Sequence, residues 1–188
     1  MTLGKRILCA SVAIAFALTA GSSLALAQAK KKKSKCKDGE TEQVASYKLS
    51  KGKNLNQQIQ ASLTGKSGDA KAGLKWMTHR RLGNCIACHQ SKKILAKAKP
   101  DDTGSMKKYA FHGKIAPPLD GAADRYTEGE LRLIVVNSKK AFPDLNTIMP
   151  SFHVNSGLNK VIGDCKGLAI LSAERVEDVV AYLKTLKE

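Results

Sequence analysis

Residues 85–89 read Cys85-Ile86-Ala87-Cys88-His89, and the architecture of the whole chain follows from this stretch. Two thiols three positions apart on a helical turn lie on one face, so both can bond to the vinyl groups along one edge of a porphyrin. The next residue, His89, can then turn its imidazole toward the iron. This spacing is the attachment sequence for c-type haem. We therefore predict one covalent haem c, bound through Cys85 and Cys88, with His89 as an axial ligand of the iron.

Three other interpretations of the motif stay open from the residues alone. A thioredoxin-like redox pair would open the helix of a βαβ unit, and no such pattern is visible here. A zinc site would need a second ligand pair, which His79 and His112 do not supply neatly. A structural disulfide between the two cysteines would leave His89 unexplained. All three interpretations imply a protein without haem, such as a thiol–disulfide exchanger.

The composition agrees with a bound prosthetic group. The chain has 188 residues but only one Trp, four Tyr and four Phe, so its aromatic content is thin for a core of this size. A porphyrin is a large, flat, apolar body that can replace the missing aromatic side chains. The length indicates one domain with an extension. Five cysteines are too few for a small domain that depends on disulfides.

The segments around the motif are expected to be helical. Asp69 can cap a helix over 70–82, which ends at the break formed by Gly83-Asn84. The stretch Thr127-Glu128-Gly129-Glu130 is a capping box, and it opens a helix that runs to about Val136.

The last helix has the clearest pattern. Ser172 can cap it, and it should cross the first helix through an apolar stripe made of Val176, Val179, Val180, Leu183 and Leu186. Residues 90–108 are expected to form a lysine-rich surface loop. Since no strand-type alternation competes with these patterns, the predicted fold class is all-α.

Two proline-containing loops can complete the iron site. In the loop 113–121, two prolines forbid regular helix and leave carbonyls free, one of which can accept the Nδ1–H of His89 and fix its tautomer. Met149 lies beside Pro150, just before the last helix, and a thioether on such a loop is a good candidate for the sixth ligand. His112 and His153 are the alternatives, in a bis-histidine site; otherwise we expect them to be surface histidines.

The N-terminus predicts export. Lys5 and Arg6 precede an apolar run over 7–20, and Ala25-Leu26-Ala27 provides a cleavage site before Gln28. We interpret 1–27 as a signal peptide and expect the protein in the periplasm; a retained anchor is the alternative. No other apolar run reaches the roughly 20 residues of a membrane span.

The chain is strongly basic, with 32 Lys and Arg against 16 Asp and Glu and a formal net charge of +16. An exported protein rarely meets nucleic acid, so we expect an acidic protein partner or an anionic substrate instead. Part of the charge lies in one lysine run over 30–37. This run is either a solvated arm or an arm that steers docking.

Residues 69–187 resemble a class I monohaem cytochrome c domain, which implies that fold with an N-terminal extension. More narrowly, the chain is similar to the SoxX family, the small cytochrome subunits of the bacterial thiosulfate-oxidising Sox system. Apart from the haem motif, the matching pieces are Pro117-Pro118-Leu119-Asp120-Gly121, Leu131-Arg132-Leu133-Ile134-Val135-Val136, Thr147-Ile148-Met149-Pro150-Ser151-Phe152 and Val176-Glu177-Asp178-Val179-Val180-Ala181-Tyr182-Leu183. Ala116 departs from the glycine that is common there.

The resemblance implies a role and a set of ligands. In that family the chain pairs with SoxA, whose haem is catalytic, and the complex joins thiosulfate to a cysteine of the carrier SoxYZ. This chain would take up the electrons and pass them to a diffusible cytochrome, without being catalytic by itself. Cys85 and Cys88 would carry the thioethers, His89 and Met149 would bind iron, and Pro117 would offer its carbonyl to His89. A free-standing electron shuttle that docks an acidic partner is the alternative.

Cys36 and Cys165 are additional to the haem motif. Leftover thiols usually pair in an oxidising compartment, and a bridge between these two would tie the N-terminal arm to the stretch before the last helix. A bridge from Cys36 to a partner chain is the alternative. The predicted organisation is a signal peptide at 1–27, a lysine-rich extension at 28–67 and a cytochrome domain at 68–188. Segment 38–67 is interpreted as a wrap for another subunit.

Overall fold

The computed structural model describes residues 43–80, 82–97, 113–156 and 163–188. The predicted signal peptide, the lysine run, Cys36 and His112 lie outside these residues. By its contacts the chain divides into two units, Met1–Lys32 and Lys33–Glu188, and all described residues belong to the second. Within the described ranges, no helix is both long enough and apolar enough to cross a bilayer.

The described part of the chain is mainly helical, as predicted. One short antiparallel pair joins β1 (Ser50–Lys51) to β2 (Gln57–Gln58). The helices, in chain order, are α1 (Ala70–Thr78), η1 (Cys85–Ala87), α2 (Lys92–Lys97), α4 (Ala122–Arg125), α5 (Glu128–Val136), α6 (Ser138–Ala141), η2 (Gly163–Cys165) and α7 (Ala173–Leu183), where η denotes a 3₁₀ helix.

The three helix starts that the sequence predicts are confirmed. Asp69 accepts a hydrogen bond from the Lys71 amide at the start of α1, at 2.7 Å. Thr127 forms the complete capping box with Glu130 at the start of α5, and Ser172 accepts from the Arg175 amide at the start of α7. Each cap satisfies an amide that the first helical turn leaves without an intrahelical partner.

Helix α1 is shorter than predicted: it ends at Thr78, whereas the sequence predicted an end at Leu82. The backbone turns back on the last helical turn: Leu82 and Asn84 both donate their amides to the His79 carbonyl, at 3.1 Å. Gly83 passes so close to this turn that a Cβ there would lie 2.6 Å from the Trp76 carbonyl oxygen. The glycine therefore permits a tight return into the haem motif.

The expectation of a loop throughout 90–108 is wrong for 92–97, which form α2. Its start is capped from a distant loop, because the Asp120 carboxylate accepts from the Lys92 amide at 2.6 Å and from the Ser91 hydroxyl at 2.8 Å. A cap supplied from so far along the chain leaves no local pattern in the sequence.

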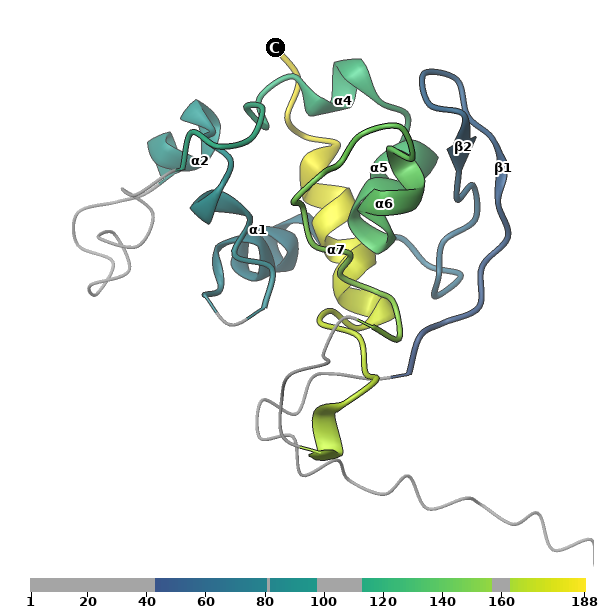
Figure 1. Cartoon of the computed structure of the whole chain (residues 1–188). Coiled ribbons are helices and arrows are strands. Elements are labelled where there is room, and N and C mark those ends of the chain that lie inside the picture. The colour runs from purple at the N-terminus through teal and green to yellow at the C-terminus, as the bar shows by residue number, and fades with distance from the viewer. Residues whose placement is uncertain (1–42, 81, 98–112, 157–162) are drawn as a thin grey trace, which may run out of the picture. The chain divides into compact units, whose positions relative to one another are not determined.

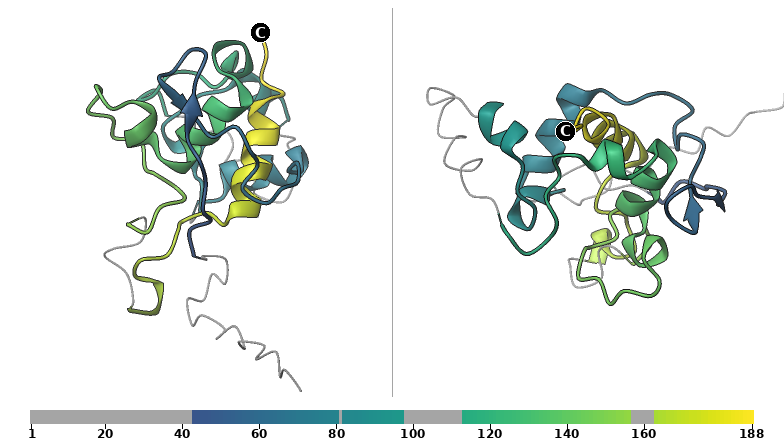
Figure 2. Two further views of the ribbon diagram at one scale, coloured as in Figure 1. Left: turned by 90° about the vertical axis from the view of Figure 1, so that its right-hand side faces the viewer. Right: turned by 90° about the horizontal axis from the view of Figure 1, so that it is seen from above.

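Helices α1 and α7 cross closely, as predicted (Figure 1). A Cβ on Gly73 would lie 2.0 Å from the Asp178 carbonyl oxygen, so the two backbones touch at this glycine. The Asp178 carboxylate also accepts from the Asp69 amide at 2.7 Å and from the Trp76 indole N–H at 2.9 Å. Helix α7 contacts α5 as well, and the views in Figures 1 and 2 place it between α1 and α5.

The N-terminal segment 43–67 packs against α5. The Ile59 amide donates to the Gly129 carbonyl at 3.0 Å, and the Asn54 and Leu55 amides donate to the Glu130 carboxylate. Burial opposes ionisation of this carboxyl, but the hydrogen bonds from Leu55, Thr127 and Asn54 prevail and lower the pKa of Glu130 to about 2. The described part of 38–67, which we interpret from the sequence as a wrap for another subunit, packs against its own domain; its contact with another subunit stays a prediction.

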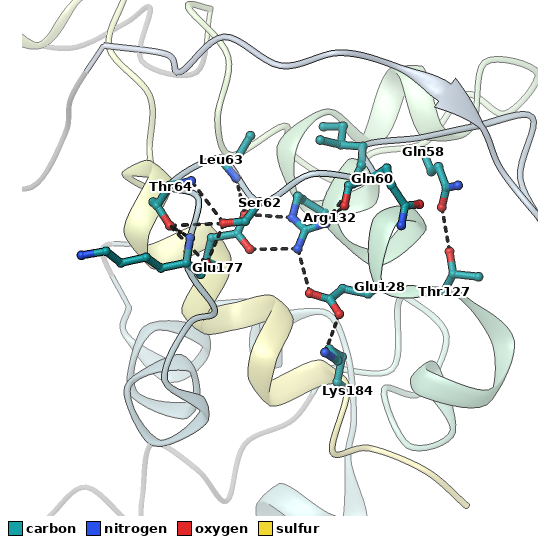
Figure 3. A network of polar contacts seen from close by, with 12 residues as sticks. Gln58, Gln60, Ser62, Leu63, Thr64, Thr127, Glu128, Arg132, Glu177 and Lys184 are labelled. Carbon is teal, nitrogen blue, oxygen red and sulfur yellow. Dashed lines mark hydrogen bonds and ion pairs between the residues drawn. The ribbon is translucent and has the colours of Figure 1, made fainter.

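A buried arginine joins this segment to α5 and α7 (Figure 3). The Arg132 side chain is 2% exposed and pairs with Glu177 through two bonds of 2.8 and 3.0 Å. It also donates to the Ile59 carbonyl at 2.8 Å and pairs with Glu128, which in turn contacts Lys184. Glu177 accepts from the Leu63 amide at 2.9 Å. Two buried charges thus satisfy each other and the backbone of the N-terminal segment.

Candidate functional site

The haem motif begins at a left-handed residue. Asn84 has φ 45°, a conformation that asparagine tolerates better than most residues. It opens the single 3₁₀ turn η1, in which the Ala87 amide donates to the Asn84 carbonyl and the His89 amide donates to the Cys85 carbonyl. This compact turn presents Cys85, Cys88 and His89 to one cavity, since all three line it.

The cavity has a volume of about 920 Å³. This is near the upper end of the range for small-molecule and cofactor sites. Its walls are mainly apolar and come from α1, α5, α7 and the 142–152 loop, through residues that include Met77, Leu131, Ile134, Phe152, Val179 and Leu183. A large apolar cavity with two thiols and an imidazole at its edge fits a covalently attached porphyrin.

The loop after residue 112 is bonded to the motif along its length. The Ala116 amide donates to the Cys88 carbonyl at 3.0 Å, and the Leu119 amide donates to the Gln90 carbonyl at 2.9 Å. Pro117 then places its carbonyl oxygen 2.6 Å from Nδ1 of His89, so the alanine at 116 does not disturb this contact.

This contact determines the state of the imidazole. Because the Pro117 carbonyl can only accept, the proton of neutral His89 lies on Nδ1 and leaves the Nε2 lone pair available for a metal. Burial lowers the pKa of His89, and the hydrogen bond to Pro117 opposes this in part. A neutral imidazole is the form that binds iron.

Arg125 helps to hold the loop that contacts His89, and this role was not predicted from the sequence. Arg125 donates through Nη2 to the Pro118 carbonyl at 2.7 Å and through Nη1 to the Asp120 carbonyl at 2.9 Å. The guanidinium fork therefore holds the proline loop through two carbonyls, and Arg125 itself lines the cavity. Neither a motif nor a spacing in the sequence marks this residue.

Met149 lines the same cavity as His89. Its carbonyl accepts from the Ser138 hydroxyl at 2.7 Å, and its amide donates to the Thr147 hydroxyl at 3.2 Å. Met77 also lines the cavity, from α1, and its side chain is completely buried. Among the described residues, two thioethers therefore line the cavity, and Met149 is the one that lies on a loop.

His153 is neither a surface residue nor part of the cavity lining, so both expectations for it are wrong. It is 0% exposed. Its Nδ1 lies 2.8 Å from the Leu171 carbonyl, and its Nε2 accepts from the Ala45 amide at 2.8 Å. Because both ring nitrogens are engaged by backbone groups, neither is available to a metal.

The thiols of the motif are unpaired in the structure. Burial raises the pKa of the Cys85 thiol to about 12, although a backbone hydrogen bond lowers it in part. The raised pKa disfavours the thiolate of Cys85, which is the form that takes part in thiol–disulfide exchange. Among the described residues, no group of three or more His, Cys, Asp or Glu side chains is placed to hold a metal ion. Cys165 is buried and disulfide-bonded.

Three apolar side chains line the cavity and are also exposed to solvent. Ile115 is 69% exposed, Leu145 63% and Ile148 76%. They mark the open side of the cavity, and we call them the apolar rim.

Comparison with known proteins agrees with this geometry. The family model described as cytochrome c matches residues 70–187. A chain in the crystal structure of SoxXA from P. pantotrophus is 42% identical and superimposes with a TM-score of 0.56, over 70% of this chain and 90% of that chain. No match was found among curated proteins. The chain therefore has the all-α class I cytochrome c fold with one covalent haem c, and it belongs to the cytochrome c family, among its SoxX-type members.

Proposed function

We propose that this chain is the electron-accepting subunit of a SoxXA-type complex. In this proposal its partner is a SoxA-type cytochrome, and the complex couples thiosulfate to a cysteine of a SoxYZ-type carrier. The supporting observation is the match of both sequence and structure to a SoxXA chain. The chain accepts and passes on electrons, while bond formation takes place on the partner.

The proposed coupling is a two-electron oxidation. The carrier thiol R–SH and thiosulfate form R–S–S–SO₃⁻, and the new S–S bond releases one proton and two electrons. When bound, the haem supplies a one-electron couple, so this chain takes up the electrons one at a time. A diffusible cytochrome downstream receives them.

In this proposal each site residue has a defined role. Cys85 and Cys88 hold the haem covalently, and His89 binds the iron through Nε2 while Pro117 keeps its Nδ1–H engaged. Met149 supplies the sixth ligand, and a histidine–methionine pair gives a higher reduction potential than two nitrogen ligands. The cavity walls exclude water from the haem.

The apolar rim surrounds the open side of the haem cavity, where a redox partner would approach the haem. A stable partner is supported by the match to a chain of a SoxXA structure. The alternative, a free-standing shuttle docked by its lysines, predicts only encounters that weaken with salt. Isolating the protein from its native cells at high ionic strength distinguishes the two: a second cytochrome that remains bound supports the proposal, and a monomer supports the shuttle.

Replacing Met149 by leucine tests the ligand. We expect Met149→Leu to lose the weak near-infrared sulfur-to-iron band of the ferric protein and to have a lower reduction potential, because the thioether no longer binds iron. Met77→Leu is the matched control, since it removes the other thioether of the cavity. If the band persists in Met149→Leu and is lost in Met77→Leu, the ligand assignment is wrong.

We also propose that Cys165 is paired with Cys36. Cys165 is disulfide-bonded, and the predicted signal peptide would bring the chain into an oxidising periplasm, where 1–27 is removed. Peptide mapping of the mature protein without reductant should yield one linked pair that contains both cysteines, and Cys165→Ser should lower the free energy of unfolding by about 2–4 kcal/mol. A Cys36 linked to a partner chain would show the alternative to be right.

A further inference from the structure

His153 is a buried polar group that bonds two segments far apart in the sequence. Its Nδ1 faces the Leu171 carbonyl and its Nε2 accepts from the Ala45 amide, both at 2.8 Å. A carbonyl only accepts and an amide N–H only donates, so these partners select the neutral ring with its proton on Nδ1. A change at Nδ1 leaves the buried Leu171 carbonyl without its bond, and a change at Nε2 leaves the partly buried Ala45 amide without its bond.

The residue lies at the end of the loop that carries Met149. The Phe152 amide donates to the Val135 carbonyl and the His153 amide to the Val136 carbonyl, both at 3.1 Å, and the Leu171 amide donates to the Phe152 carbonyl at 2.9 Å. The end of the loop is thus fixed between the last turn of α5 and residue 171. Only Pro150 and Ser151 separate Met149 from this fixed point, and proline restricts the backbone there.

The two partners of His153 lie on different sides of it: Leu171 lines the haem cavity, whereas Ala45 does not. Ala45 lies in the N-terminal segment that packs on α5, and Leu171 lies between the disulfide-bonded Cys165 and the start of α7. In the part of the chain that the structure describes, the hydrogen bond from Ala45 to His153 joins the N-terminal segment to the end of the methionine loop.

We propose that His153 is a positioning residue for the axial methionine. Through His153, the N-terminal segment stabilises the binding of Met149 to the iron. The inference rests on the proposed ligand role of Met149. It assigns no direct contact between His153 and the haem. When the Ala45–His153 bond is made, the end of the loop is held on both sides and the thioether stays in place. When the bond is lost, the loop loosens and the sixth position becomes more accessible to other ligands.

Two substitutions remove the same bond from opposite ends. Ala45→Pro deletes the donor amide and leaves His153 in place. His153→Asn keeps a donor for the Leu171 carbonyl but is too short to reach Ala45, whereas His153→Gln places an oxygen near the former Nε2 and can accept from Ala45. Asp69→Ala is the control, because it removes a helix cap on α1 and touches neither the loop nor the cavity.

The experiment uses the full-length, haem-loaded ferric protein with added imidazole, which competes with the methionine for the iron. One partly buried hydrogen bond corresponds to about fivefold in the equilibrium between bound and released methionine. We expect Ala45→Pro and His153→Asn to bind imidazole about fivefold more tightly than the wild type, with a weaker near-infrared band and a lower reduction potential. His153→Gln should recover part of the change, and Asp69→Ala should show none.

Equal imidazole affinity in the wild type, Ala45→Pro and His153→Asn would overturn the inference, even if both variants unfold more easily. The Met149→Leu experiment distinguishes this failure from a failure of the ligand proposal. If Met149→Leu loses the band while the other variants keep their wild-type affinity, only the positioning role is refuted. If Met149→Leu keeps the band, both proposals are refuted.

Discussion

A protein with both Cys85→Ala and Cys88→Ala should carry no covalent haem and should lose its cooperative thermal unfolding transition. The thioethers are the only covalent attachment that the motif offers, and without the haem a cavity of about 920 Å³ stays open between α1, α5 and α7. An engineered apolar cavity of ~150 Å³ is already a large defect in a small protein. The pyridine haemochrome spectrum and circular dichroism on heating measure the two effects.

The single variant Cys88→Ala is the matched control, because it keeps one thioether and the whole cavity lining except one sulfur. We expect this variant to retain haem and a lower but cooperative melting transition. If the double variant folded cooperatively without haem, the role of the haem as part of the core would be refuted.

The variant Arg132→Leu should lose about 3–5 kcal/mol of unfolding free energy. It leaves the Glu177 carboxylate, which is 3% exposed, without its two bonds from the guanidinium, and it removes the donor to the Ile59 carbonyl. Urea unfolding of the haem-loaded protein, followed by far-ultraviolet circular dichroism, gives the free energy.

Two further variants test whether the loss of stability arises from the burial of the Arg132–Glu177 pair. Lys184→Ala breaks the contact to Glu128, a pair with side chains 46% and 42% exposed, and should cost less than about 1 kcal/mol. Adding Glu177→Leu to Arg132→Leu should restore part of the stability, because no unpaired buried charge remains. Equal losses for Arg132→Leu and Lys184→Ala would contradict the assigned role of the network.

The features that the sequence predicted well are those encoded by neighbouring residues. The caps at Asp69, Thr127 and Ser172 each depend on a side chain and an amide within one helical turn, so a local pattern is sufficient. The haem motif is equally local, and the cavity contains its three residues together with Met149 and Pro117.

The features that were missed depend on contacts between distant residues. Helix α2 is capped by Asp120 from another loop, and His153 is bonded by Ala45 and Leu171. Arg132 gave one usable signal, because it is the only charge within the apolar run 131–136. Such a charge predicts a buried partner, but it does not say that the partner is Glu177.

The contacts that support the two iron ligands differ in the length of the chain segment between the bonded residues. The His89–Pro117 contact joins residues 28 positions apart, whereas the Ala45–His153 contact joins residues 108 positions apart. Closing the longer loop costs more conformational entropy, and contacts of this kind form late in folding. We therefore expect the histidine side to assemble before the N-terminal segment docks, which would leave the sixth coordination position of the newly made cytochrome open to rival ligands for a time.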